Sequence, residues 1–157
     1  MIDCAFRTEE GRFYYCVRAI IIRDNKLLAM HDEVSPYFYL PGGKVAMGET
    51  AEEAVLREVL EEFKIKAKIV RPLWLCQNFF TLKQKNEKYH EIGLYFLLDI
   101  PKGTLTENEF VLKEGKHTLR FNWLEIEKLK DEFLYPEFIK SEVANLPESL
   151  QMIYEKE

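Results

Sequence analysis

Runs of apolar residues separated by polar turns predict a protein built largely from β-strands. Residues 14–22 and 89–100 are rich in β-branched and aromatic side chains, which favours buried strands. The turn-forming sequence at 23–26 separates the first run from a second apolar run that ends at His31, so these two runs are expected to form a hairpin. Weaker patterns predict strands within 66–80, with a break at Pro72, and within 119–124.

One strong helix is expected in the middle of the chain. Residues 51–63 contain neither Gly nor Pro and are rich in Ala, Leu, Glu and Arg, which favour helix. Thr50 precedes them and Glu53 follows three positions later, which is the spacing of a capping box. Strands lie on both sides of this helix and a second helical pattern begins at 125. The sequence therefore predicts an α/β protein with a mixed sheet covered on both faces.

The remaining segments carry weaker signals. We expect a short lead-in over 1–11, a polar loop over 104–116, a helix that begins at 125 with Pro136 in a first helical turn and, from 147, a further helix or a loose tail. The chain has no internal repeats, low-complexity segments or linkers, so we predict one domain spanning 1–157.

Acidic residues occupy unusual positions on the predicted helix. Glu58 and Glu62 fall inside the stripe of small apolar residues that includes Ala54 and Val55, and Glu61 falls beside it. Like charges one turn apart repel each other, and partial burial increases the cost. A hard cation that takes oxygen ligands removes this penalty. A single Glu on a helix is usually just solvated, but three converging beside a Gly-Gly turn indicate a cation site.

A longer motif contains these acids. The segment 43–65 has Gly43, then Glu49 after five residues, then REVLEEFKI at 57–65 after seven more. This spacing resembles the Nudix box of MutT-like hydrolases, G-x5-E-x7-R-E-U-x-E-E-x-G-U, where U is a bulky aliphatic residue. The departure is Lys64, where the family usually has Gly. Because Gly suits a helix end that needs positive φ, this departure concerns the helix end and not the acids.

The resemblance implies the α/β/α sandwich of the Nudix fold, in which the box over 43–65 forms a loop, a helix and a loop. It implies hydrolysis of a phosphoanhydride with Mg²⁺, or Mn²⁺ as a substitute. Such chemistry needs the phosphate charge offset and a water aimed in line. Catalytic roles are implied for Glu61, Glu62 and Glu114. Glu114 stands for the acid that the family often supplies from a late loop, and Glu107 and Glu109 are its rivals.

The resemblance also divides the box into metal ligands and a structural pair. Glu49 and Arg57 are expected to form an ion pair that holds the box together. Glu61 is either a ligand or the base that activates the attacking water, because the identity of the base varies across the family. The expected metal ligands are Glu58, Glu61, Glu62 and the carbonyl of Gly43.

The substrate is expected to be a nucleoside diphosphate linked to another moiety, of the nucleoside triphosphate or nucleotide-sugar type. Family members specific for ADP-ribose tend to carry a Pro downstream of the box and dinucleoside polyphosphate enzymes a Tyr, but residues 79–83 have neither. An Asn that reads oxidised guanine is absent from 134–137. Substrate contacts are expected from Arg18, Tyr37 and Phe80, although Arg18 also suits a strand edge or bulge and the aromatic rings also suit core packing.

Two other functions remain open. A Nudix-fold sensor would bind a nucleotide metabolite without hydrolysing it, but a sensor does not need the intact set of acids. An isoprenoid diphosphate isomerase shares the fold and would need a reactive Cys and Glu; Cys76 is a candidate, although a buried structural thiol is the simpler interpretation. His90 and Glu91 are expected to be an exposed pair at the start of a strand, with a ligand-facing position as the alternative.

Composition excludes several classes of protein. The formal net charge of −5 argues against a nucleic-acid-binding surface, and no apolar run is long enough to span a membrane. Three cysteines without a CxxC motif suggest reduced thiols in a cytoplasmic protein rather than disulfides or zinc. Nudix hydrolases are often dimers, so a homodimer that binds a small nucleotide is one expectation.

Overall fold

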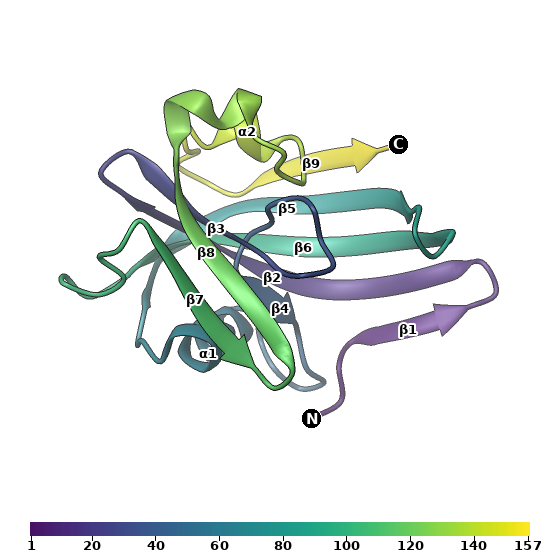
Figure 1. The fold of residues 1–157 in the computed structure, drawn as a ribbon. Helices are drawn as coiled ribbons and strands as arrows, with labels where there is room; N and C mark the ends of the chain where they lie inside the picture. Colours follow the sequence, from purple (N-terminus) through teal and green to yellow (C-terminus); the bar gives the residue numbers. More distant parts are fainter.

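The computed structural model describes residues 1–157. Nine strands form one mixed sheet, and three helical segments accompany it (Figure 1). The strands are β1 (Ala5–Thr8), β2 (Gly11–Arg23), β3 (Lys26–His31), β4 (Gly42–Lys44), β5 (Lys68–Leu82), β6 (Glu87–Asp99), β7 (Glu109–Glu114), β8 (His117–Glu125) and β9 (Gln151–Lys156). The helical segments are α1 (Ala51–Phe63), the 3-10 helix η1 (Ile126–Asp131) and α2 (Ile139–Glu142).

The sheet is mixed, as the sequence predicts. Its strand order is β7-β8-β3-β2-β6-β5-β9, and both β1 and β4 also pair with β2. The pairs β2–β6 and β5–β9 are parallel, whereas the other pairs are antiparallel. The predicted hairpin of β2 and β3 is present. Its turn residues Asp24 and Asn25 both have positive φ, the conformation that tight hairpin turns require.

Two hydrophobic cores lie on the two faces of the sheet. On one face, Val55 and Val59 of α1 pack with Val17 and Phe96 of the sheet. On the other face, side chains from η1 and α2 pack with strand residues, among them Leu129, Ile139, Trp74 and Tyr95. The expected α/β/α arrangement is therefore confirmed. No helix in the structure is long and apolar enough to cross a membrane.

The predicted polar loop at 104–116 is wrong in its second half, which forms β7. Phe110 and Leu112 alternate with polar residues and pair with Phe121 and Leu119 of β8. The rings of Phe110 and Phe121 stack with centroids 5.0 Å apart. The acids on either side make this short alternation look like a loop, but the packing of Phe110 and Leu112 against β8 holds it as an edge strand.

The C-terminal predictions also need correction. The helix expected from 125 is limited to η1 and the four-residue α2, and the segment between them contains a cis peptide bond before Pro136. From 151 the chain forms β9 instead of a helix or a loose tail, and this strand pairs in parallel with β5. Within the lead-in, residues 5–8 form β1 against β2. Each of these strands depends on a partner that local patterns do not reveal.

The break expected at Pro72 appears as irregular pairing inside one long strand. β5 is continuous, but its register with β6 shifts between Ile69 and Arg71 and again between Pro72 and Trp74. Proline cannot donate a ladder hydrogen bond, so it is accommodated at such an irregularity.

Helix α1 begins and ends with local signals that the sequence contains. Thr50 accepts a hydrogen bond from the Glu53 amide and the Glu53 carboxylate accepts one from the Thr50 amide, which confirms the capping box. At the other end, Lys64 adopts the left-handed conformation with φ 58°. The helix end therefore has the geometry for which Gly is favoured, although a lysine occupies it.

We expect Lys64→Gly to raise the free energy of unfolding by about 1 kcal/mol, because Gly lacks the Cβ that makes the left-handed conformation unfavourable. Urea denaturation measures the change. Lys64→Ala is the matched control, since it also removes the ammonium group but keeps the Cβ and should give no such gain. Equal stabilisation by both substitutions would contradict backbone strain as the cause.

Candidate functional site

Two glycines let the backbone of β4 lie between β2 and the acidic face of α1. Gly42 and Gly43 pair opposite Arg18 and Val17 of β2. Gly42 has φ 146°, and a Cβ there would overlap the Val17 carbonyl oxygen. A Cβ on Gly43 would overlap the carboxylate of Glu58. A side chain at either position would therefore displace β2 or Glu58.

Arg57 connects the helix to the loop that precedes it. Its Nε and Nη2 donate to the two carboxylate oxygens of Glu49 at 2.6 and 3.0 Å, and Nη2 also donates to the Lys44 carbonyl at 3.1 Å. Glu49 in turn accepts from the Ala46 amide. The hydrogen bonds from Arg57 lower the pKa of Glu49 below its usual value. This planar two-bond contact fixes the loop on the helix.

Arg57 also contacts two further acids of the helix. Its Nη1 lies 2.8 Å from Glu58 Oε1 and 3.3 Å from Glu61 Oε2. Burial raises the pKa of Glu58, and the hydrogen bond from Arg57 opposes this effect. The Glu61 side chain is about half exposed, so its carboxylate remains accessible to water.

Glu62 is the acid that Arg57 does not reach. Its Oε1 accepts a hydrogen bond from the Gly42 amide at 3.2 Å. Its Oε2 is buried and has no hydrogen-bond partner. Burial raises the pKa of Glu62 to about 8, and the negative charge of Glu58 adds to this increase. A buried carboxylate oxygen without a partner is costly, so this position calls for a positive group.

The acids as they lie do not form a closed metal cage. No group of three or more His, Cys, Asp or Glu side chains is positioned to hold a metal ion. Mg²⁺, however, binds through one or two carboxylates together with water and substrate phosphate oxygens. The unpartnered oxygen of Glu62, whose other oxygen accepts from the Gly42 amide, is of the kind that such an ion takes, and Glu58 lies against the adjacent Gly43. The residues present therefore fit a divalent cation.

Among the three late acids, Glu114 is the one whose charge reaches the helix. It raises the pKa of both Glu58 and Glu62. Glu114 ends β7 beside the turn to β8, where it pairs opposite His117. Glu109 begins the same strand and Glu107 precedes it, so both lie toward the far end of the hairpin.

Arg18 lies inside the sheet, at neither an edge nor a bulge. It sits in the uninterrupted register of β2 with β6, opposite Tyr95, and its side chain is about one quarter exposed. Its Nη2 lies 3.8 Å from Glu91 Oε2. Burial lowers the pKa of Arg18, but Cys16, Glu91 and, less strongly, Glu62 raise it above its usual value, so this guanidinium lies within electrostatic reach of the box.

Glu91 corrects a prediction from the sequence. It was expected to be exposed beside His90, yet it is 7% exposed and is the one buried charged residue of the chain, whereas His90 is exposed. The alternation of β6 turns Glu91 to the same face as Arg18, while His90 faces the other side. Only the pairing of β6 with β2 reveals this position, so sequence reasoning had no direct signal for it.

Of the two aromatic candidates, Phe80 lies apart from Arg18, whereas the ring of Tyr37 contacts Tyr39, on which the charges of Arg18 and Glu62 act. Phe80 pairs opposite Tyr89 and stacks on its ring with centroids 5.0 Å apart. Tyr89 and Tyr95 are six residues apart on β6, so Phe80 lies roughly 20 Å along the sheet from Arg18. Tyr37 belongs to a separate aromatic cluster, in which its ring contacts those of Tyr39, Phe133 and Tyr135.

The cysteines show no sign of reactivity. Cys4, Cys16 and Cys76 are free thiols. Burial raises the pKa of Cys76 to about 12 and also raises that of Cys16, so both thiols stay protonated near neutral pH. Cys76, the candidate for an isomerase, is therefore not a thiolate near neutral pH.

This fold and this acidic helix are those of one protein family. The model of the NUDIX domain matches residues 14–142, and the chain belongs to this family. It is also 37% identical over 92 residues to the ADP-ribose pyrophosphatase of Methanocaldococcus jannaschii. That match covers 57% of this chain and 52% of the relative, so the chain spans about half the length of the curated relative that it matches.

Solved structures agree on the fold. The MutT protein of Bacillus halodurans aligns with a TM-score of 0.60 at 14% identity, covering 91% of this chain and 90% of that one. An ADP-ribose pyrophosphatase of Streptococcus suis aligns with a TM-score of 0.58 at 17% identity, covering 90% and 98%. The MutT protein of Methanosarcina mazei aligns with a TM-score of 0.51 at 27% identity, covering 83% and 90%.

We expect Arg57→Lys to lower the free energy of unfolding by about 1–2 kcal/mol, because an ammonium group cannot replace the two parallel hydrogen bonds to Glu49 and the bond to the Lys44 carbonyl. Arg120→Lys is the control, since Arg120 is exposed and makes no ion pair in the structure. Its stability should stay within about 0.5 kcal/mol of wild type. Equal effects of the two substitutions in urea denaturation would refute the proposed role of the Arg57 contacts.

Proposed function

We propose that this protein is a Nudix hydrolase that cleaves the phosphoanhydride of a nucleoside diphosphate linked to another moiety. Water adds to one phosphorus, the bridging P–O bond breaks, and a nucleoside monophosphate and a phosphorylated remainder leave. The observation that carries this proposal is the buried Oε2 of Glu62, which lacks a partner while its carboxylate lies against the Gly42–Gly43 backbone. Such an unsatisfied acid suits a site completed by a cation.

Each residue of the box receives a role in this proposal. Glu58, Glu62 and the carbonyl of Gly43 hold Mg²⁺, with Mn²⁺ as a substitute. When bound, the ion offsets the charge of the phosphate oxygens. Glu61 is accessible to water and serves as a further ligand or as the base that takes a proton from it. The pair of Glu49 and Arg57 positions the helix against the loop.

Two acids besides Glu61 belong to the proposed catalytic set. Burial raises the pKa of Glu62 to about 8 when no cation is bound, so a cation is needed to keep its carboxylate charged near neutral pH. Glu114 lies at the end of a hairpin, and its charge acts on Glu58 and Glu62. We assign Glu61, Glu62 and Glu114 as the catalytic acids.

The substrate binds beside Arg18 in this proposal. Arg18 is only partly satisfied by Glu91, because 3.8 Å exceeds a hydrogen-bond distance, so its guanidinium remains available to a phosphate oxygen. Tyr37 is the ring contact offered, whereas Phe80 lies too far along the sheet for a substrate bound beside Arg18 and packs on Tyr89 instead. The relative from Methanocaldococcus jannaschii is named for ADP-ribose, a nucleoside diphosphate linked to a sugar, so ADP-ribose is the first compound to test alongside UDP-sugars and nucleoside triphosphates.

We expect wild type with Mg²⁺ to hydrolyse at least one of these compounds. Glu62→Gln and Glu61→Gln should each reduce kcat by about 100-fold or more, because each keeps its shape but loses a charge at the reacting phosphate. Product release is followed with a phosphatase-coupled assay. Glu52→Gln is the matched control, since Glu52 is an exposed acid on the first turn of the same helix.

Two outcomes would end the proposal. One is tight binding of a nucleotide to wild type without turnover of any compound, which would make the protein a sensor. The other is an equal loss of activity in Glu52→Gln and in the two box variants, which would make the effect one of helix charge and not of the site.

A further inference from the structure

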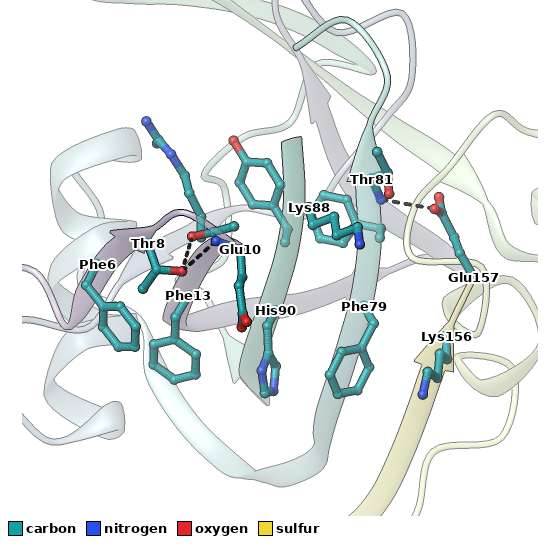
Figure 2. Close-up of a pocket in the computed structure, with 14 residues that line it drawn as sticks. Phe6, Thr8, Glu10, Phe13, Phe79, Thr81, Lys88, His90, Lys156 and Glu157 are labelled. Atoms are coloured by element: carbon teal, nitrogen blue, oxygen red, sulfur yellow. Dashed lines mark hydrogen bonds between the residues drawn. The ribbon is translucent and has the colours of Figure 1, made fainter. Parts of the chain in front are cut away.

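Glu91 is a buried acid of β6 that lies outside the Nudix box and has no role in the proposed reaction. It is 7% exposed. Figure 2 shows its neighbour His90 between Phe13 and Phe79, and the rings of both contact the imidazole. Because side chains alternate along a strand, Glu91 points to the opposite face of the sheet, where Arg18 also lies.

The carboxylate of Glu91 has only weak polar contacts. Its Oε2 lies 3.8 Å from Nη2 of Arg18, which exceeds a hydrogen-bond distance. Its other polar neighbour is the thiol of Cys16. Burial raises the pKa of this thiol and the charge of Glu91 adds to the increase, so the thiol stays protonated, but a thiol is a weak donor. A buried carboxylate in this state is costly unless a stronger donor completes it.

A second acid on the same face shows what a satisfied carboxylate looks like here. Glu155 of β9 pairs opposite Asn78, which in turn pairs opposite Glu91, so the three side chains form one row across the sheet. Glu155 accepts a hydrogen bond from the Phe138 amide at 2.7 Å. Glu91 keeps only its two weak contacts. We therefore looked for its missing donors outside the chain.

The row of Glu91 lies at the margin of the layer that covers this face. Tyr95, four residues farther along β6, is covered by the ring of Phe138, with centroids 5.3 Å apart, and is 1% exposed. The neighbours that pair opposite Glu91, Tyr14 and Asn78, are partly exposed. A ligand that binds at Arg18 therefore has an open path along these neighbours to Glu91.

Charge decides which part of a ligand can meet this acid. The inference rests on the proposed function, in which a phosphate of the substrate binds Arg18. Phosphate oxygens are negative and accept hydrogen bonds, so the carboxylate repels them. In a nucleoside diphosphate the first groups beyond the phosphates that can donate are the hydroxyls of the ribose. Acidic side chains bind the ribose 2′-hydroxyl in this way in dinucleotide-binding folds.

We propose that Glu91 binds the 2′- and 3′-hydroxyls of the substrate's ribose and thereby makes the site selective for ribonucleotides over 2′-deoxyribonucleotides. Two neighbouring hydroxyls match the two oxygens of one carboxylate. Asn78, opposite Glu91, offers a donor and an acceptor to the same sugar. A site built to bind a hydroxyl rejects the analogue without it, because the buried polar group is then left unpaired.

The test compares the ribose and 2′-deoxyribose forms of α,β-methylene nucleoside diphosphates, which cannot be cleaved at the bridge. Adenine, guanine and uracil pairs are titrated with Mg²⁺ by isothermal titration calorimetry. For the base that binds most tightly, wild type should bind the ribose form at least about 10-fold more tightly. Glu91→Gln keeps the shape but loses the charge, so this ratio should fall to about 3-fold or less.

Glu87→Gln is the matched control. Glu87 is another acid of β6 on the same face, but its carboxylate pairs with Arg7 and Arg12 at 2.7 and 3.1 Å. This variant should keep the wild-type ratio. Inorganic pyrophosphate is the probe without a sugar, and Glu91→Gln should bind it at least as tightly as wild type, because no hydroxyl contact is lost and a repelling charge is removed. Circular dichroism confirms that both variants are folded.

The wild-type ratio needs no substitution and decides first. A ratio near one, or no measurable binding of any pair, overturns the proposal. An unchanged ratio in folded Glu91→Gln also overturns it, as does equal weakening of ribose, deoxyribose and pyrophosphate binding, since Glu91 would then only position Arg18. Turnover is measured separately: a wild type that keeps the ratio but hydrolyses no nucleotide refutes the proposed hydrolase and supports the ribose contact.

Discussion

Arg57 allows the acidic face of α1 to pack against the rest of the protein. Its guanidinium offers five donors, and it uses them on the two oxygens of Glu49, on Glu58, on Glu61 and on the Lys44 carbonyl. One cation thereby holds the loop and offsets part of the charge of the helix. Glu62 is beyond its reach and keeps a buried oxygen without a partner. Arg57 thus leaves the most desolvated acid of the box without a hydrogen-bonded cation.

The pairing of β4 with β2 brings the acidic face of α1 close to Arg18. The Gly42 amide donates a hydrogen bond to Glu62, and Gly42 pairs opposite Arg18 in the sheet. Glu62 and Arg18 are therefore both neighbours of the same glycine. Because side chains alternate along β2, Val17 packs under α1 while the adjacent Arg18 points to the other face toward Glu91.

The features found from the sequence are those determined by neighbours along the chain. The capping box of Thr50 and Glu53, the hairpin turn at Asp24 and Asn25, and the spacing of the acids on α1 are all local. Strand β9 could not be predicted from the sequence, because its partner β5 lies more than 70 residues away and the sequence between them gives no sign of the pairing. The burial of Glu91 could not be predicted for the same reason, since it follows from the pairing of β6 with β2.

The proportions of the fold explain why it leaves apolar surface exposed. A nine-stranded sheet with one helix of three to four turns cannot bury both of its faces along strands of 13–15 residues. The middle of β2, at Val17 and Arg18, pairs with β4 of the box, whereas its beginning, near Phe13, carries aromatic rings. Because α1 is much shorter than these strands, it does not cover the aromatic part of the sheet.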